Sequence, residues 1–443
     1  MRSKRVAFHT LGCKLNYTET SMLWQQLHGN GYEKVGFEDA ADVYVINTCS
    51  VTDNADKECR RIVRKALNAN ENAKVVVTGC YAQLKPDEIA TINGVSAVIG
   101  AQDKFRLADI LEEIETDSHQ AIYSCDINDV VTYKASYAIG ERTRAFLKVQ
   151  DGCDYLCTYC TIPLARGKSR SDTVSNVVQQ AIDISHQGVK EIVLSGVNIG
   201  DFGYSNGLER RQETLLRLIQ ALEENVTGIE RFRISSIEPN LLNNAIIDFV
   251  ASSKRFVPHF HIPMQSGSDT ILKAMKRRYL TKLYRERIEH IKAVMPHVCI
   301  GADVIVGFPG ETEKEFAETV TFIEALSLSY LHVFTYSERD NTAAILFDNV
   351  VPRTVRHQRN KTLRQLSEQK RDAFYGGHLN SVRSVLWESE NDGDYMHGYT
   401  DNYIRVRTNF DDALVNNVTP VLLQKIDSGE VVGTLTSALY HAV

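Results

Sequence analysis

Residues 153–160 are Cys-Asp-Tyr-Leu-Cys-Thr-Tyr-Cys, a C-x3-C-x2-C run on the loop that follows the apolar stretch 145–150. Three thiolates at this spacing fit three irons of a [4Fe–4S] cubane. A tetrahedral structural zinc requires a fourth ligand, so a zinc site is the weaker alternative. A cubane held by three cysteines keeps one iron open to a further ligand. The run therefore predicts a catalytic cluster on Cys153, Cys157 and Cys160.

Composition sets the class of protein around this motif. Hydrophobic residues make up 43% and charged residues 24% of the 443 residues, as in soluble globular proteins. The net charge of −6 argues against a chain that binds nucleic acid through its overall charge. We expect neither a membrane span nor an export signal. Nine cysteines, an odd number, then favour metal or redox chemistry in a reducing cytoplasm over disulfides.

Outward from the motif, residues 141–372 repeat a βα pattern that predicts a partial barrel of six units. The expected strands are 145–150, 191–195, 232–235, 260–265, 303–307 and 331–336. Chemistry in such a barrel gathers at the carboxyl ends of the strands. Polar residues there are Asn198, Glu238, Gln265, Glu311 and Ser337.

Residues 1–117 form another βα series, which predicts a doubly wound parallel α/β domain. Cys13, Cys49 and Cys80 each follow an expected strand directly. Because the carboxyl ends of parallel strands share one edge, these auxiliary cysteines can converge on a second cluster. The alternative is ordinary core packing of each thiol. Residues 118–140 lack clean periodicity and are expected to be a linker.

The last part of the chain changes character. Short strands with polar turns over residues 375–440 predict a small antiparallel β-barrel of a type that often binds nucleic acid. Residues 377–443 hold 4 Lys/Arg and 9 Asp/Glu, whereas residues 353–376 hold 7 Lys/Arg and 2 Asp/Glu. The basic helix is therefore the better candidate for phosphate contact. The candidates there are Arg356, Arg359, Lys361 and Arg364.

The cysteine run with its barrel closely resembles the radical SAM superfamily, and the whole chain resembles its methylthiotransferases. That family combines an N-terminal domain with three cluster cysteines, a radical SAM core and a small C-terminal barrel called TRAM. The motifs that carry the resemblance are Gly12-Cys13-Lys14-Leu15-Asn16, Asn47-Thr48-Cys49, Gly79-Cys80, the run 148–167, Pro263-Met264-Gln265-Ser266-Gly267 and the segment 303–312.

One dipeptide indicates the branch. Lys14-Leu15 after Cys13 is similar to the MtaB type, which methylthiolates C2 of N6-threonylcarbamoyladenosine at position 37 of tRNA. The isopentenyladenosine branch usually has Gln-Met there, and the branch acting on an aspartate of a ribosomal protein has Pro-Lys. The resemblance thus implies a transferase that uses two [4Fe–4S] clusters and two molecules of S-adenosylmethionine. It also implies a tRNA anticodon stem-loop as partner and an electron donor such as a flavodoxin or ferredoxin, and it leaves the sulfur source open.

The resemblance places the S-adenosylmethionine pocket less sharply. Gly307 to Glu311 matches the adenine-side segment, and Glu238 and Gln265 occupy strand ends suited to ribose or sulfonium contacts. Ser195-Gly196-Val197-Asn198 replaces the superfamily's common Gly-Gly-Glu, which leaves the amine contact open. The segment 336–342, which includes Ser337, lacks the glycine that usually precedes the threonine in the family.

Further residues admit two interpretations each. Arg60, Arg61 and Arg64 form a basic helix face that is either solvated or in contact with RNA. His259 and His261 are interpreted as pocket lining or core, with a role as metal ligands as the alternative. Three other functions compete for the whole chain. These are methylthiolation of a ribosomal-protein aspartate, a zinc-containing RNA-binding protein without catalysis, and a radical SAM enzyme with inert N-terminal cysteines.

Overall fold

A six-stranded parallel sheet forms the N-terminal part of the chain. The computed structural model describes residues 3–50, 53–116, 120–139, 143–204 and 211–436. The sheet has the order β2-β1-β3-β4-β5-β6. Its strands are β1 (Arg5–Thr10), β2 (Glu33–Lys34), β3 (Val43–Thr48), β4 (Lys74–Gly79), β5 (Val95–Ile99) and β6 (Ala121–Tyr123).

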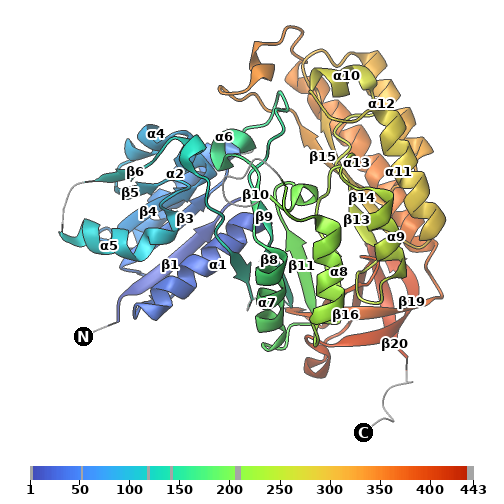
Figure 1. Cartoon of the computed structure of the whole chain (residues 1–443), viewed down its shortest axis with the longest axis horizontal. Helices are drawn as coiled ribbons and strands as arrows, with labels where there is room; N and C mark the ends of the chain where they lie inside the picture. Colours follow the sequence, from blue (N-terminus) through green and yellow to red (C-terminus); the bar gives the residue numbers. More distant parts are fainter. Residues whose placement is uncertain (1–2, 51–52, 117–119, 140–142, 205–210, 437–443) are drawn as a thin grey trace.

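Helices cover both faces of this sheet, as the doubly wound prediction requires (Figure 1). The two separate apolar clusters around the sheet account for this layering. Helices α1 and α5 pack on one face, and α2 and α4 pack on the other. The helices are α1 (Lys14–Gly29), α2 (Asp53–Ala69), α3 (Cys80–Leu84), α4 (Pro86–Ala90) and α5 (Leu107–Thr116), with a 3-10 turn η1 (Lys104–Arg106).

The central part contains the six parallel strands that the sequence predicts. Three of them form the parallel sheet β12-β11-β8 and three form the parallel sheet β13-β14-β15, and a parallel bridge between Ser236 and His261 connects the two sheets. The strands are β8 (Arg144–Lys148), β9 (Gln150–Asp151), β10 (Arg170–Ser171), β11 (Glu191–Ser195), β12 (Arg231–Ile234), β13 (His259–His261), β14 (Cys299–Val306) and β15 (Tyr330–Thr335). The partial (β/α)6 barrel is therefore confirmed.

Helices surround this barrel, and most of them contribute side chains to its apolar core. They are α6 (Ile162–Arg166), α7 (Val174–Ser185), α8 (Leu215–Asn225), α9 (Asn244–Ser252), α10 (Asp269–Ala274), α11 (Thr281–Val294), α12 (Glu313–Ala325) and α13 (Arg353–Gly376), with 3-10 turns η3 (Ile199–Asp201) and η4 (Ala343–Leu346). Alternate residues of the strands face this helical layer, so the remaining ones face the barrel lumen.

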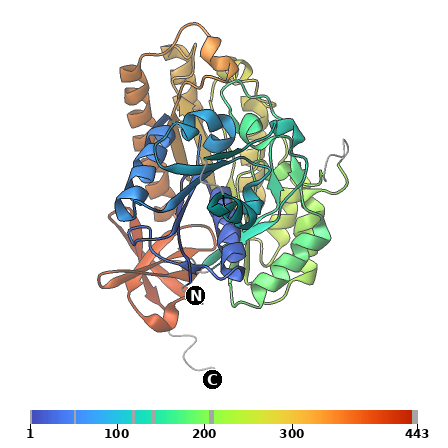
Figure 2. The ribbon, with the colours of Figure 1, turned by 90° about the vertical axis from the view of Figure 1, so that its left-hand side faces the viewer.

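The segment expected to be a linker has structure of its own. Strand β6 extends the N-terminal sheet, and β7 (Ser136–Ala138) pairs antiparallel with β8 of the central barrel. A 3-10 turn η2 (Ile127–Asp129) lies between them. Helix α1 contacts both β7 and β8, so the N-terminal domain is seated on the open side of the partial barrel (Figures 1 and 2).

The C-terminal strands close into the predicted barrel, in the order β16-β17-β18-β20-β19. One pair, β18 with β20, is parallel, so the barrel is not wholly antiparallel. Its strands are β16 (Val382–Asp392), β17 (Tyr395–Thr400), β18 (Arg405–Asn409), β19 (Val418–Asp427) and β20 (Glu430–Leu435), with a turn η5 (Asp412–Leu414). The fully buried Trp387 centres its core, and the architecture is that of a TRAM-like domain.

This small barrel covers the base of the central one. Arg231 on β12 donates hydrogen bonds to the carbonyl oxygens of Ser384 and Tyr399. Arg144 on β8 pairs with Glu388 at 2.9 Å. The lumen is therefore closed at the amino ends of its strands. Among the described residues, no helix is long and apolar enough to cross a membrane.

Candidate active site

The auxiliary cysteines meet at one edge of the N-terminal sheet. Cys13, Cys49 and Cys80 follow β1, β3 and β4, which are neighbours in the sheet. The loops pack so closely that a Cβ on Gly12 would lie 2.8 Å from Sγ of Cys49. Gly79 has a φ of +100°, and a Cβ there would lie 2.3 Å from the carbonyl oxygen of Thr48. Only glycine satisfies both the close approach and the positive φ.

One buried side chain holds two of these loops together. Asn16, near the start of α1, donates hydrogen bonds to the carbonyl oxygens of Leu11 and Thr48 at 2.8 and 2.9 Å. These carbonyls lie in the loops of Cys13 and Cys49. Burial raises the pKa of the Cys80 thiol to about 11. A buried neutral thiol beside two others is suited to becoming a thiolate only when a metal binds.

The radical-site cysteines, Cys153, Cys157 and Cys160, form the second trio, on the loop after β9. Burial raises the pKa of all three, to about 12 for Cys153 and Cys160. The backbone N–H of Tyr155 donates to Sγ of Cys153 at 3.4 Å. Arg277 donates from Nη1 to Sγ of Cys157 at 3.1 Å. Such donors stabilise negative charge on sulfur, so this trio also suits an iron–sulfur cluster.

Arg277 is a site residue that the sequence analysis missed. It lies in the segment between α10 and α11, 120 residues from Cys157, and its side chain is 3% exposed. Its other guanidinium nitrogen pairs with Glu238, a predicted S-adenosylmethionine contact. Glu238 therefore lies beside the radical-site cysteines, with one oxygen engaged by arginine.

The other predicted cofactor contacts lie at carboxyl ends of barrel strands. Asn198 follows β11, Gln265 follows β13, Gly307 and Glu311 follow β14, and Ser337 follows β15. Among the described residues, Oδ1 of Asn198, Oε1 of Glu311 and Oγ of Ser337 are buried without a hydrogen-bond partner. Burying an unpaired polar atom costs roughly 1–3 kcal/mol. These orphaned atoms fit a polar ligand bound across the strand ends.

Glu311 is more constrained than its predicted role suggested. Its Oε2 accepts hydrogen bonds from the Gly307 N–H and from Nη1 of Arg359, the latter at 2.8 Å. Burial raises the pKa of Glu311 although both donors oppose the shift. The carboxylate therefore fixes the turn from Gly307, and only its Oε1 is left for a ligand.

Arg356 and Arg359 are not the RNA-facing residues that we predicted. Arg356 is 2% and Arg359 is 6% exposed. Arg356 donates to the carbonyl oxygens of Val351 and Tyr336 and pairs with Glu338. Their prediction as phosphate contacts is wrong, because their guanidinium groups are committed to the interior. Lys361 and Arg364, on another face of α13, are exposed.

The basic residues of α2 remain at the surface. Arg61 and Arg64 are exposed and Arg60 is half-buried. Arg60 pairs with Glu88 at 3.0 Å, and Arg61 pairs with Glu58 one turn away. RNA contact by Arg60 or Arg61 would require its ion pair to break. The predicted RNA contact is therefore simplest for the exposed Arg64.

A buried group of charges joins the two cysteine-bearing domains. Arg166, at the end of α6, donates to Glu19 at 3.0 Å, to Asp151 at 2.9 Å and to Oδ1 of Asn16 at 2.6 Å. Lys104 pairs with Glu19 at 2.7 Å. The set, which we call the interdomain charge network, is Glu19, Lys104, Lys148, Asp151, Arg166 and Arg170.

Electrostatics in this network favour the charged forms of its two carboxyl groups, Glu19 and Asp151. Burial alone would raise the carboxyl pKa values of Glu19 and Asp151. The surrounding cations outweigh burial, and Arg166 contributes most to lowering both pKa values well below the usual range. Asp151 also accepts from the backbone N–H of Gly152, next to Cys153. The network therefore connects both cysteine loops through hydrogen bonds.

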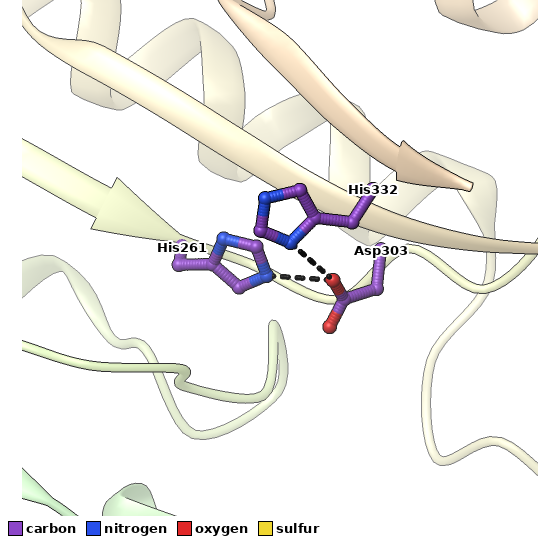
Figure 3. Close-up of side chains that lie close together, drawn as sticks. All are labelled: His261, Asp303 and His332. Carbon is purple, nitrogen blue, oxygen red and sulfur yellow. Dashed lines mark hydrogen bonds and ion pairs between the residues drawn. The ribbon is translucent and has the colours of Figure 1, made fainter. Parts of the chain in front are cut away.

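Three side chains from adjacent strands gather in the barrel lumen (Figure 3). His261 of β13 and His332 of β15 flank Oδ1 of Asp303 of β14, at 2.9 and 3.5 Å. We call them the lumen triad. Their ligand atoms all lie within 4.8 Å of one another, so the set could hold a metal ion. The sequence analysis considered His261 but missed Asp303 and His332, which need the strand register to be seen.

A tyrosine continues this cluster toward the base of the barrel. The hydroxyl of Tyr330 lies 3.3 Å from Nδ1 of His261 and 3.2 Å from Nε2 of His259. Burial lowers the pKa of His259 well below its usual value, and Arg233 adds to this effect. His259 is therefore neutral, and the predicted interpretation as pocket or core histidine describes it better than a ligand role.

Comparisons with known proteins agree with this geometry. Residues 5–100 match the family described as uncharacterized protein family UPF0004, and residues 147–323 match the radical SAM superfamily. The structure resembles that of the radical S-adenosylmethionine methyltransferase TsrM from Kitasatospora setae, with a TM-score of 0.57 at 12% identity over 88% of this chain and 79% of that chain. That likeness concerns the fold alone. The class is thus a radical SAM enzyme with an additional N-terminal α/β domain.

Sequence relatives define the family more narrowly. The chain is 39% identical over 427 residues to threonylcarbamoyladenosine tRNA methylthiotransferase MtaB of Bacillus subtilis (strain 168), across 95% of this chain and 94% of the relative. It is 38% identical over 405 residues to the protein of the same name from Aquifex aeolicus (strain VF5), across 91% and 96%. A tRNA-2-methylthio-N(6)-dimethylallyladenosine synthase of Clostridium novyi (strain NT) is 30% identical over 90% and 89%. The chain belongs to the MtaB family of radical SAM methylthiotransferases.

Proposed function

We propose that this enzyme transfers a methylthio group to C2 of N6-threonylcarbamoyladenosine at position 37 of tRNA. It would use two molecules of S-adenosylmethionine and two [4Fe–4S] clusters. The observation that carries the proposal is the pairing of two cysteine trios across one buried network. Arg166 bonds to Asp151, next to the radical-site loop, and to Asn16, which holds two auxiliary loops. The names of the relatives at 38–39% identity support the threonylcarbamoyladenosine substrate.

Each trio has a distinct task in this proposal. Cys153, Cys157 and Cys160 would hold the cluster that binds S-adenosylmethionine, and Cys13, Cys49 and Cys80 would hold the auxiliary cluster. When bound, the first cluster would supply reductive cleavage of the sulfonium of S-adenosylmethionine, and the second would supply a site for a sulfur ligand. No side chain provides this chemistry. The unpartnered oxygens of Asn198, Glu311 and Ser337 would receive polar groups of S-adenosylmethionine, together with Glu238, Gln265 and the Gly307 turn.

The protein's own contribution is position and exclusion of water. The interdomain charge network fixes the two cysteine loops relative to each other, and α1 covers the open side of the barrel. The closed base leaves the carboxyl-end face for RNA. His332 of the lumen triad has a side chain that is 57% exposed, and it is suited to contact an inserted nucleotide. Lys361, Arg364 and Arg64 would contact phosphates of the anticodon stem-loop.

The proposal also assigns a role to each domain and a class of electron donor. Residues 1–117, 141–372 and 375–440 would act as the methylthiotransferase, radical SAM and TRAM-like domains. An electron donor such as a flavodoxin or ferredoxin would reduce the clusters in a cytoplasmic setting.

A nucleoside assay tests the proposal. Reconstituted enzyme, S-adenosylmethionine, reductant and sulfide are incubated with three anticodon stem-loops, which carry threonylcarbamoyladenosine, isopentenyladenosine or adenosine at position 37. Mass spectrometry of the digested nucleosides should show a methylthio product from the first substrate alone. A product from isopentenyladenosine, or methylthiolation of a ribosomal protein instead of RNA, would contradict the assigned substrate. The matched control replaces Cys80 by Ala, which should abolish transfer while S-adenosylmethionine cleavage persists.

A further inference from the structure

The lumen triad comes from three neighbouring strands of one parallel sheet. Strand β14 pairs with β13 on one side and with β15 on the other. Side chains along a strand alternate between its two faces, and Ala302 and Val304 belong to the core under the helices. Asp303 therefore points into the lumen, where Figure 3 shows the rings of His261 and His332 beside its carboxylate. The register of the sheet alone brings these three metal-binding side chains together.

The distances within the lumen triad suit one shared ion. Nε2 of His261 lies 2.9 Å from Oδ1 of Asp303, and Nδ1 of His332 lies 3.5 Å from the same oxygen. Two donor atoms that are each about 2.1 Å from one ion lie about 3.0 Å apart at a right angle and about 3.4 Å apart at a tetrahedral angle. The shorter contact fits a hydrogen bond equally well. The longer contact exceeds the usual length of an N–H···O hydrogen bond, so His332 is placed better for a shared ion.

The surroundings of the triad also match those of a metal site. The hydroxyl of Tyr330 lies 3.3 Å from Nδ1 of His261, the ring nitrogen on the side away from Asp303. Histidines that bind a metal almost always use their other ring nitrogen in such a contact, which fixes the orientation of the ring. Among the described residues, Asp303 forms no ion pair with lysine or arginine, in contrast to Glu19 and Asp151. Its carboxylate is therefore available to a cation.

We propose that the lumen triad binds a divalent transition-metal ion of the zinc and cobalt type. Two imidazoles and one carboxylate are a donor set that such ions prefer, whereas Mg²⁺ and Ca²⁺ prefer oxygen donors. Three protein ligands leave at least one coordination position open. The side chain of His332 is 57% exposed, so an ion can enter from the lumen and its open position would face the lumen. This site shares no residue with the two cysteine trios and does not depend on the proposed function.

Cobalt binding to the reconstituted enzyme tests the site. Untagged protein is dialysed without oxygen against a range of Co²⁺ concentrations, and cobalt and iron per chain are measured in the same samples. The iron content shows whether cobalt has replaced iron of a cluster. Asp303→Asn removes the anionic ligand at nearly constant volume. Asp248→Asn is the matched control, because Asp248 pairs with His290 at 2.7 Å and, among the described residues, belongs to no group of three possible ligands.

The parent should bind about one cobalt ion per chain with constant iron content. Asp303→Asn should raise the half-saturating cobalt concentration at least roughly tenfold, since loss of an outer partner alone costs about 10–100-fold in metal affinity. Tyr330→Phe keeps all three ligands and should weaken binding by roughly tenfold. Asp248→Asn should stay within about twofold of the parent. Equal binding by the parent and Asp303→Asn, or no saturable cobalt in the parent, would overturn the proposal.

Diffraction locates the ion without any variant, which keeps the test valid if a substitution impairs folding. Crystals of the cobalt-loaded parent are measured just above and just below the cobalt absorption edge. The difference should show a peak at about 2.1 Å from Nε2 of His261, Nδ1 of His332 and Oδ1 of Asp303. Iron scatters almost equally at both energies, so the clusters do not contribute. Peaks confined to surface histidines or to the cysteine trios would contradict the assignment.

Discussion

Arg166 donates a 2.6 Å hydrogen bond to Asn16 across the boundary between the two cysteine-bearing domains. The two residues are 150 positions apart in the sequence. Arg166 belongs to the short helix that follows Cys160, and Asn16 holds the loops of Cys13 and Cys49. This contact therefore helps to fix the position of one cysteine trio relative to the other.

Replacement of Asn16 by Ala should remove the auxiliary site selectively. The carbonyls of Leu11 and Thr48 would lose a buried donor, at roughly 1–3 kcal/mol for each unsatisfied group. Iron should fall from about eight to about four atoms per chain after reconstitution. Exposed Asn30, replaced by Ala, is the control and should keep the parental iron content. Full iron in the Asn16 variant would show that the loops hold without it.

Replacement of Arg166 by Met should destabilise the domain interface strongly. Glu19 and Asp151 would remain buried with fewer cations, and breaking a buried pair in this way costs about 3–5 kcal/mol. Arg166→Lys keeps the charge but loses the several directed N–H groups, so an intermediate loss is expected. Thermal unfolding of the two variants and the parent measures the order. A lysine variant as stable as the parent would mean that charge alone suffices.

Arg277 should control the reduction potential of the radical-site cluster. Its hydrogen bond to Sγ of Cys157 stabilises the more negative, reduced state, so Arg277→Gln should lower the potential. Arg278, which stacks on Tyr155 and donates to a backbone carbonyl, is the neighbouring control. An electron paramagnetic resonance titration of Arg277→Gln and of the corresponding Arg278→Gln control gives the two reduction potentials. An unchanged potential in Arg277→Gln would contradict this role.

Acid should weaken the interdomain charge network. The carboxyl pKa of Glu19 is lowered in the folded protein, so its stabilising contribution is full above the unfolded value of about 4.3 and is lost as pH falls toward the folded value. Cluster-free protein, which contains no acid-labile sulfide, is used for this test. Its unfolding temperature should stay constant from pH 7 to about 5 and fall at lower pH. Glu19→Gln should be less stable at pH 7 and show a shallower decline.

Charge reversal at the exposed basic positions of α13 should weaken RNA binding. The double variant Lys361→Glu and Arg364→Glu should weaken binding of an anticodon stem-loop and reduce the slope of log Kd against log salt by about one for each lost phosphate contact. Lys254→Glu, on an exposed position after α9, is the control. Fluorescence anisotropy at several salt concentrations measures both quantities. Parallel salt curves for the parent and the double variant would exclude α13 from the RNA surface.

The sequence predicted the three-part architecture and the convergence of the auxiliary cysteines for a simple reason. Cys13, Cys49 and Cys80 each follow a strand, and parallel strands end at one edge. The order of β1, β3 and β4 in the sheet was the only further condition, and the structure meets it. The cysteine run 153–160 needed no tertiary information.

Tertiary pairing explains what was missed. Charge counting marked α13 as basic without showing which side chains point inward. Arg356, Arg359 and Leu363 have the spacing i, i+3, i+7 of one helix face, and the apolar Leu363 was the signal that this face is buried. The contact of Arg277 with Cys157, and of Arg166 with Asn16, joins residues too far apart for any local pattern. The lumen triad depends on the register of three strands.

The C-terminal barrel that covers the base of the central barrel has a kinetic consequence. Because Arg231 and Arg144 hold the C-terminal barrel against that end, we expect large molecules to enter the lumen from the carboxyl ends of the strands. A cofactor bound deep in this lumen cannot be exchanged while a nucleotide occupies the entrance at the carboxyl ends of the strands. We therefore expect an ordered turnover, in which the RNA leaves before the spent cofactor is replaced.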